Sequence, residues 1–176
     1  MEEIILQRKL EALGQNGTLI RKDGKTFLQL DCENAKELSM KWGEKLYPFT
    51  KTGKKWILEL PFSTAVNYVQ ICVDGQEVLS PDLPIAHGYC RPYNYIELPD
   101  EEGLFELRDV PHGTLTQEFY KSKISDNWEK LIVYLPPCVP SAGLPVLYLQ
   151  HGFGESEISW STTGLSLIHI SEPTRL

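Results

Sequence analysis

The stretch HGFGESEISW, residues 151–160, brings together residue types that can do chemistry. Gly152 and Gly154 flank Phe153 in it. Because glycine has no Cβ, a loop of this composition lets main-chain N–H groups come close to a ligand. Such groups can stabilise negative charge that develops on an oxygen during a reaction. His151 adds an imidazole, a group that can brace a loop or carry a proton.

The bulk composition narrows the class of protein. The chain has 176 residues, of which 41% are hydrophobic and 23% are charged, as in soluble globular proteins. The net charge of −7 argues against binding to nucleic acid, because no basic stripe is available to neutralise phosphates. No apolar run has the ~20 residues that a membrane span needs. The acidic start lacks a signal peptide, so we expect a cytoplasmic protein, or a secreted one if the start codon is misassigned.

The cysteines are spread along the chain without a C-x-x-C pair, at Cys32, Cys72, Cys90 and Cys138. This spacing favours separate thiols over a zinc site. We therefore expect no metal and no cofactor. The sequence does not indicate an oligomeric state.

The first half has the pattern of a β-protein after a short helix. Residues 1–14 are predicted to form the helix, because apolar side chains recur near helical spacing and Gly14 can end it. Residues 15–98 alternate or run apolar over short lengths between turn residues, and Asp74-Gly75 suits a type I′ hairpin turn. Several short strands at this spacing predict a β-sandwich. The clearest strands are TFLQLDC, ELSMKW, KWILELPF and NYVQICV.

A polar segment with Pro99 and Gly103, residues 99–104, is predicted to be a linker between domains. Strand-like runs resume in residues 105–164, as FELRDV, GTLTQEFYKS and EKLIVYLPP. Val146–Leu149 is continuously apolar, which indicates a strand buried on both faces of a parallel sheet.

Residues 105–164 resemble the opening of the α/β-hydrolase domain in the esterase family that includes feruloyl esterases, acetyl xylan esterases and enterochelin-esterase-like proteins. The resemblance is carried by DVPHGT (109–114), EFYKSK (118–123), VYLPP (133–137) and PVLYLQHGFGE (145–155), followed by Trp160 and Gly164. The first part, through YVQICVDGQEVLSPDLP (68–84), is similar to the immunoglobulin-like domain that precedes the hydrolase in many such esterases. A domain of that kind also precedes glycogen-branching and isoamylase-type enzymes.

The resemblance implies a serine carboxylic ester hydrolase that acts on acyl or feruloyl esters of plant polysaccharides, or on related small esters. In this fold, a loop after the third strand supplies an oxyanion-hole N–H. The resemblance assigns that role to the main-chain N–H of Phe153, with Gly154 as the second candidate. His151 and Gly152 are expected to shape the loop, because the catalytic histidine of the fold follows the nucleophile in chain order. Most relatives have a small or aliphatic residue at position 153, so the Phe153 ring is expected to line or narrow the acyl pocket.

The catalytic triad of such an enzyme is missing. The fold needs a nucleophilic serine in a G-x-S-x-G elbow, and the chain contains none. Gly164 and Ser166 begin such a pattern, but Ile168 stands where the second glycine is required, so Ser166 and His169 receive no catalytic role. We expect this chain to be an inactive fragment of a longer enzyme.

The last residues are expected to have a different origin. LSLIHISEPTR, residues 165–175, resembles the translation of a transposase adapter used to prepare sequencing libraries. The family resemblance stops at Gly164, where this peptide begins. We expect residues 165–176 to be an artefact that lies outside the fold.

A second class of function, a carbohydrate-binding β-sandwich without catalysis, stays open at this point. Aromatic faces suit the apolar faces of sugars, although the same residues can pack the core of the sandwich. A third interpretation, a purely structural interaction domain, leaves PVLYLQHGFGE unexplained. The candidates for sugar stacking are Trp42, Trp56 and Tyr93, together with Tyr89 and Tyr95.

Overall fold

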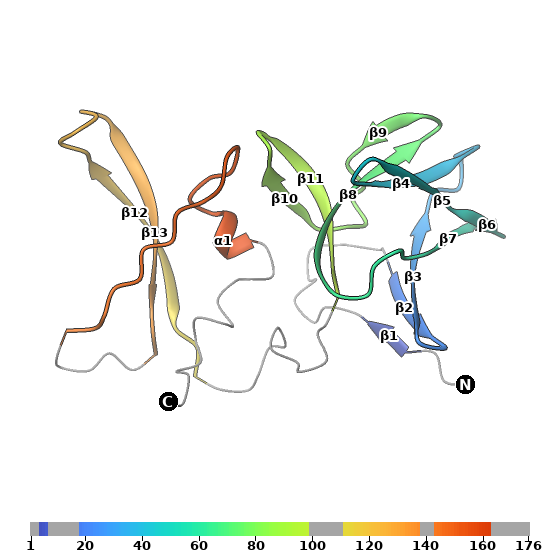
Figure 1. Ribbon diagram of the computed structural model, residues 1–176, viewed down its shortest axis with the longest axis horizontal. Coiled ribbons are helices and arrows are strands. Elements are labelled where there is room, and N and C mark those ends of the chain that lie inside the picture. Colours follow the sequence, from blue (N-terminus) through green and yellow to red (C-terminus); the bar gives the residue numbers. More distant parts are fainter. Residues whose placement is uncertain (1–3, 7–17, 99–110, 138–142, 163–176) are drawn as a thin grey trace. The chain divides into compact units, whose positions relative to one another are not determined.

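The computed structural model describes residues 4–6, 18–98, 111–137 and 143–162. The chain divides into two compact units, one of residues 1–86 and 92–98 and the other of residues 87–91 and 99–176. The regular structure of the described residues is antiparallel β-sheet, with α1 (Ser159–Thr162) as their helix (Figure 1). The predicted linker (99–104) and the adapter-like tail (165–176) lie outside the described residues.

The first unit contains two sheets, except that residues 87–91, at the tip of one hairpin, belong to the second unit. One has five strands in the order β1-β2-β3-β7-β6, and the other has six, in the order β10-β11-β8-β4-β5 with β9 paired to β8. The first sheet consists of β1 (Ile4–Leu6), β2 (Thr18–Lys22), β3 (Lys25–Asp31), β7 (Lys55–Glu59) and β6 (Thr50–Thr52). The second consists of β10 (Ile85–Gly88), β11 (Arg91–Leu98), β8 (Ala65–Val73), β4 (Leu38–Trp42), β5 (Lys45–Pro48) and β9 (Gln76–Val78).

One hydrophobic core joins the two sheets. Leu28 of β3 belongs to the same buried cluster as Met40 of β4, Ile71 of β8 and Ile96 of β11. In β3 every second side chain is buried, which is the pattern of a strand with one face on a core. Two antiparallel sheets around one core agree with the β-sandwich predicted from the sequence and are compatible with an immunoglobulin-like fold.

The hairpin turn predicted at Asp74-Gly75 is confirmed. Both residues have positive φ, 50° for Asp74 and 81° for Gly75, as a type I′ turn requires. The Asp74 carboxylate also accepts the main-chain N–H groups of Lys36 and Glu37, each at 2.9 Å. The bond from Glu37, together with the weaker effects of the Lys36 N–H and the Lys36 charge, lowers the pKa of the Asp74 carboxyl. The turn therefore holds the segment that leads into β4.

A buried amide fixes the segment before β10. Asn94 of β11 is buried; its side-chain carbonyl accepts the Ser80 N–H at 2.8 Å, and its amide donates to the Ser80 carbonyl at 2.9 Å. The same amide lies 3.2 Å from the Leu83 carbonyl and 3.4 Å from that of Pro84. Because buried polar groups are costly when unpaired, these bonds of Asn94 help to hold the conformation of SPDLP, together with the bond from the Asp82 N–H to the Ser80 hydroxyl.

The helix predicted over residues 1–14 is wrong where the structure describes that range. Ile4–Leu6 form β1, which pairs antiparallel with β2 through Ile5 and Ile20. Isoleucine is a β-branched residue that fits a pleated strand, and β2 offers a partner for its main chain. The rest of the range lies outside the described residues.

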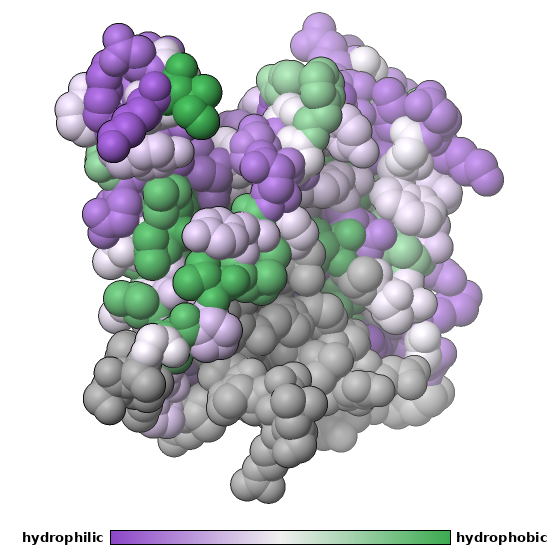
Figure 2. Space-filling view, turned by 60° about the vertical axis from the view of Figure 1, so that its left-hand side comes forward, coloured by the Kyte–Doolittle hydropathy of each residue, from purple (hydrophilic) through white to green (hydrophobic). Residues whose placement is uncertain are grey.

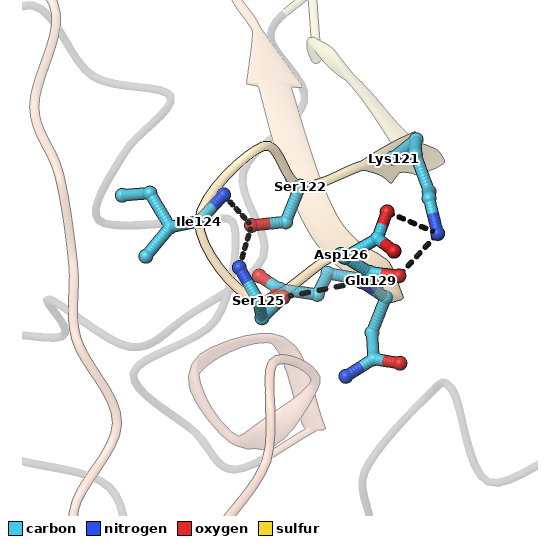
Figure 3. A network of polar contacts seen from close by, with 7 residues as sticks. Lys121, Ser122, Ile124, Ser125, Asp126 and Glu129 are labelled. Carbon is cyan, nitrogen blue, oxygen red and sulfur yellow. Dashed lines mark hydrogen bonds and ion pairs between the residues drawn. The ribbon is translucent and has the colours of Figure 1, made fainter.

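The second unit contains one two-stranded sheet, β12 (Thr114–Lys121) with β13 (Trp128–Leu135), at the two runs predicted as strands. Figure 3 shows the polar contacts of their connection. The Ser122 hydroxyl accepts the main-chain N–H groups of Ile124 and Ser125, both at 3.3 Å, and the Ser125 hydroxyl donates to Glu129 at 2.5 Å. These contacts keep the connection compact and the two strands in register.

The strand predicted at Val146–Leu149 is wrong. Residues 143–150 form no strand, and the four side chains of Val146–Leu149 are exposed. A strand needs a neighbour for its main-chain N–H and C=O groups, and none of the described strands pairs with this segment. Residues 146–149 therefore do not join any sheet formed by the described residues, and the described residues form no parallel sheet.

Candidate glycine loop

The candidate loop is a tight turn over residues 152–155. The Glu155 N–H donates to the Gly152 carbonyl at 3.2 Å, which closes the turn. Gly154, its third residue, has φ 76°. A positive φ at this position is typical of a type II turn and explains why glycine stands there. The sequence therefore forms a turn where the two glycines led us to expect a loop.

Two side chains hold the Gly152 peptide groups in place. The Glu155 carboxylate accepts the Gly152 N–H at 2.9 Å. The Nδ1 atom of His151 lies 2.9 Å from the Gly152 carbonyl oxygen. A carbonyl oxygen can only accept, so this bond places the imidazole proton on Nδ1. His151 thus contacts the loop backbone from within the loop itself.

Phe153 presents a free main-chain donor. Within the described part of the chain, its N–H makes no hydrogen bond, and its side chain is 90% exposed. The direction of the N–H is nevertheless fixed, because it belongs to the same trans peptide as the Gly152 carbonyl and points the opposite way. That carbonyl is held by Glu155 and His151. Phe153 therefore offers an oriented N–H group that is unpaired as far as the described residues go.

The loop is also held on the Gly154 side. Residues 87–91 belong to the same compact unit as the loop. Within that unit, the Cys90 N–H donates to the Gly154 carbonyl at 2.9 Å. A Cβ at Gly154 would lie 2.4 Å from the Cys90 nitrogen, closer than any real contact. Glycine is therefore required at this position by the space as well as by the backbone conformation.

The residues after the loop begin a short helix. The Ser156 N–H donates to the Ser159 hydroxyl at 3.0 Å, and the Ser159 N–H donates to the Ser156 carbonyl at 3.0 Å. The Ser159 side chain and main chain thus both bond to the main chain of Ser156, which closes a turn directly before the helix. Glu157 pairs with Lys130 of β13 at 2.5 Å, and the Lys130 ammonium is the main cause of a lowered pKa of the Glu157 carboxyl. The ion pair connects the start of α1 to the β12–β13 sheet.

The aromatic candidates for sugar stacking are mostly packed against protein. Trp56 is 4% exposed, and its indole N–H donates to the Cys32 carbonyl, so its ring has no free face for a sugar. Tyr95 is also buried. Trp42 packs on the core and lies 5.0 Å from Phe62, ring centre to ring centre.

Tyr93 lies 6.0 Å from Tyr68 on the β8–β11 face, with the two rings at 64° to each other. They form no coplanar platform. Tyr89 is exposed, but it lies in the other unit.

Among the residues that the structure describes, no group of three or more His, Cys, Asp or Glu side chains is placed to hold a metal ion. Cys32, Cys72 and Cys90 are free thiols, and burial is the main cause that raises the pKa of Cys72. Cys138 lies outside the described ranges. No helix in the described part of the chain is long and apolar enough to cross a membrane.

Three features of the loop were missed by sequence reasoning. Glu155 could have been found, because a carboxylate three residues after a loop glycine can accept its N–H across a turn. The contacts of Cys90 with Gly154 and of Lys130 with Glu157 join distant parts of the chain, so local sequence carries no signal for either.

The structure thus defines a β-rich protein with a two-layer antiparallel unit and a second unit that contains a glycine turn, in which the Phe153 N–H has no partner among the described residues. A comparison with known protein families finds no match. The chain is 27% identical over 165 residues to the endo-1,4-beta-xylanase/feruloyl esterase of Xylanibacter ruminicola, a similarity that covers 86% of this chain. It spans 23% of the length of that protein. The similarity supports a relationship to esterases.

Proposed function

We propose that this chain carries the oxyanion loop of a serine carboxylic ester hydrolase. The observation that supports this best is the main-chain N–H of Phe153, which is fixed in direction and has no partner among the described residues. Attack on an ester carbonyl turns its oxygen into an oxyanion, and a donor that is already oriented stabilises this charge without reorganisation. The Gly154 N–H is the second candidate for the same role.

The remaining catalytic groups lie outside this chain in our proposal. The sequence contains no G-x-S-x-G, so the nucleophile, the acid and the base have no candidates in it. His151 serves the loop, because its Nδ1 proton is used on the Gly152 carbonyl. We therefore propose that these 176 residues are inactive on their own, as part of a longer enzyme.

The proposed domain arrangement follows from the same relationship. We propose an immunoglobulin-like sandwich over residues 15–98, a linker over 99–104 and the start of an α/β-hydrolase domain over 105–164. The aligned protein is named as a xylanase and feruloyl esterase, and this chain spans 23% of its length. Its name supports a substrate in which an acyl or feruloyl group is esterified to a plant polysaccharide.

The Phe153 ring is proposed to line the acyl pocket. It is 90% exposed and lies on the residue whose N–H would bind the oxyanion. An acyl group bound at that N–H would therefore lie within reach of the ring. Aromatic rings stack favourably on one another, which suits a feruloyl group better than an acetyl group.

Variants of Phe153 in the longer protein test the proposal. In our proposal, that protein is encoded by genomic DNA that continues beyond the codon of Gly164. Phe153→Gly and Phe153→Ala keep the N–H, so kcat should fall modestly while the preference between acyl groups changes. Phe153→Pro deletes the N–H, and loss of one such donor costs ~10²–10³ in kcat.

Proline can also distort the loop, so the variants are compared only if their melting temperatures agree. A folded Phe153→Pro enzyme with a near-parental kcat would show that Phe153 is not the donor. The same series at Gly154 would then test the second candidate.

A further inference from the structure

The turn between β10 and β11 has an unusual backbone. Tyr89 and Cys90 are its two central residues, with φ values of 50° and 63°. Two successive positive φ angles define a type I′ turn, which normally holds Asn-Gly or another glycine pair because side chains disfavour this region. Neither Tyr89 nor Cys90 is glycine or asparagine, the residue types that adopt this conformation at low cost.

The N–H of Cys90 is used outside the hairpin. In a two-residue turn, the N–H of the second central residue is not part of the strand ladder. Here it donates to the Gly154 carbonyl at 2.9 Å. The unfavourable conformation of the turn therefore coincides with a specific hydrogen bond to the glycine loop.

The loop is shaped to accept this turn. A Cβ at Gly154 would lie 2.4 Å from the Cys90 nitrogen and 2.7 Å from the Tyr89 Cα. Gly24 has nearly the same φ, 74° against 76°, but a Cβ added there would meet nothing within 4 Å. The close approach is therefore a property of the Gly154 site and not of positive-φ glycines in general.

The hydrogen bond from Cys90 acts on the peptide group that joins Gly154 to Glu155. The Gly154 carbonyl of this group accepts the Cys90 N–H, and the Glu155 N–H of the same group donates to the Gly152 carbonyl. The Gly152 carbonyl is in turn the group that fixes the direction of the Phe153 N–H. A chain of three peptide groups thus connects the Tyr89–Cys90 turn to the free donor.

We propose that the Tyr89–Cys90 turn is a positioning element for the Phe153 N–H. The turn touches neither the substrate nor the reacting atoms in this proposal, and it acts by holding the Gly154 carbonyl. That the positioned N–H serves catalysis rests on the proposed function. That the turn orients it rests on the contacts alone, so the two can fail separately.

Amide exchange and chemical shifts of the ¹⁵N-labelled full chain test the positioning role. Gly154→Ala should speed the exchange of the Cys90 amide at least ~10-fold and move the Phe153 amide resonance, because the added Cβ collides with the turn. Gly24→Ala is the matched control, since it brings the same backbone strain without the collision, and it should change neither signal. Cys90→Gly keeps the N–H and removes the strain of the positive φ. The protection of the amide of residue 90 and the Phe153 resonance should therefore stay close to those of the parent.

Unchanged Cys90 exchange in Gly154→Ala, or an unmoved Phe153 resonance, would overturn the proposal. A change of the same size in Gly24→Ala would overturn it too, because backbone strain alone would then explain the effect. None of these measurements requires catalysis. Failure of the Phe153→Pro test in the longer enzyme would remove the proposed function and leave the positioning role intact.

Discussion

The two units of the chain differ in what their apolar side chains contact. In the first unit, Leu28 and Met40 are fully buried between two sheets. In the second, Leu147 is 75% exposed and Trp128 of β13 is 72% exposed. Figure 2 shows apolar side chains gathered at the surface in this part of the chain. The same residue types are thus a core in one unit and a surface in the other.

The difference shows that strand pairing and core formation are separate requirements. Strands β12 and β13 pair along their whole length, from Thr114 opposite Leu135 to Lys121 opposite Trp128. Every residue of β12 is nevertheless exposed. The two strands are held by main-chain bonds and by the polar connection of Figure 3. Two strands alone do not form a stable unit in water. The first unit gains its stability from a second layer that the described part of the second unit lacks.

Limited proteolysis should give the largest contrast between the units. The first unit has a closed core, so we expect a resistant fragment that ends near residues 98–104, while the residues after it are digested. Mass spectrometry of the digest identifies the end of the fragment. A resistant fragment that reaches Gly164 would contradict the contrast.

Core truncation should separate the units by several kcal/mol. Leu28→Ala removes a side chain with 0% exposure, and we expect it to lower the free energy of unfolding by about 2–5 kcal/mol. Leu147→Ala is the matched change in the second unit and should have an effect within about 0.5 kcal/mol. Urea unfolding followed by circular dichroism measures both. Equal losses would mean that Leu147 is packed in solution.

Removal of the buried amide should cost less than the largest core truncation but still a measurable amount. Asn94→Ala leaves the Ser80 N–H and the Ser80 carbonyl without the bonds at 2.8 and 2.9 Å. We expect the free energy of unfolding to fall by about 2 kcal/mol or more. Asn67→Ala in β8 is the control, because its amide donates to the Thr64 carbonyl at an exposed site. A loss for Asn94→Ala no greater than for Asn67→Ala would show that Asn94 does not hold the SPDLP segment.

The smallest effect concerns the Asp74 turn and depends on pH. Two main-chain N–H groups lower the pKa of Asp74 from its ordinary value of 3.8, so the carboxylate stabilises the fold above that pH. This stability is lost as the pH falls through the lower pKa of the folded state. Asp74→Asn keeps the turn conformation but cannot titrate.

The melting temperature of Asp74→Asn should therefore be slightly below that of the parent at pH 7, and the difference should vanish below the folded-state pKa. Melting curves between pH 7 and pH 2 measure it. A constant difference over this range would contradict the role of the charge.

Sequence reasoning succeeded where the structure depends on neighbours in the chain. Asp74-Gly75 is a turn because these two residues accept positive φ. The alternation of apolar and polar side chains along β3 matches its one buried face. It failed where the partner is distant. Ile4–Leu6 fits a helical spacing and a strand equally well until β2 offers it an edge. The turn at Tyr89–Cys90 lacks glycine or asparagine at its two central positions, so the sequence does not predict it. Its hydrogen bond to Gly154 joins residues that are far apart in the sequence.

The central claim is that this chain supplies the oxyanion donor of a serine esterase whose nucleophile lies outside it. Labelling with a fluorophosphonate, followed by mass spectrometry, tests this most directly. In the longer protein we predict one labelled serine, within a G-x-S-x-G after residue 164, and in these 176 residues alone we predict no label. A labelled serine within residues 1–164, or a longer protein that takes up no label, would contradict the account.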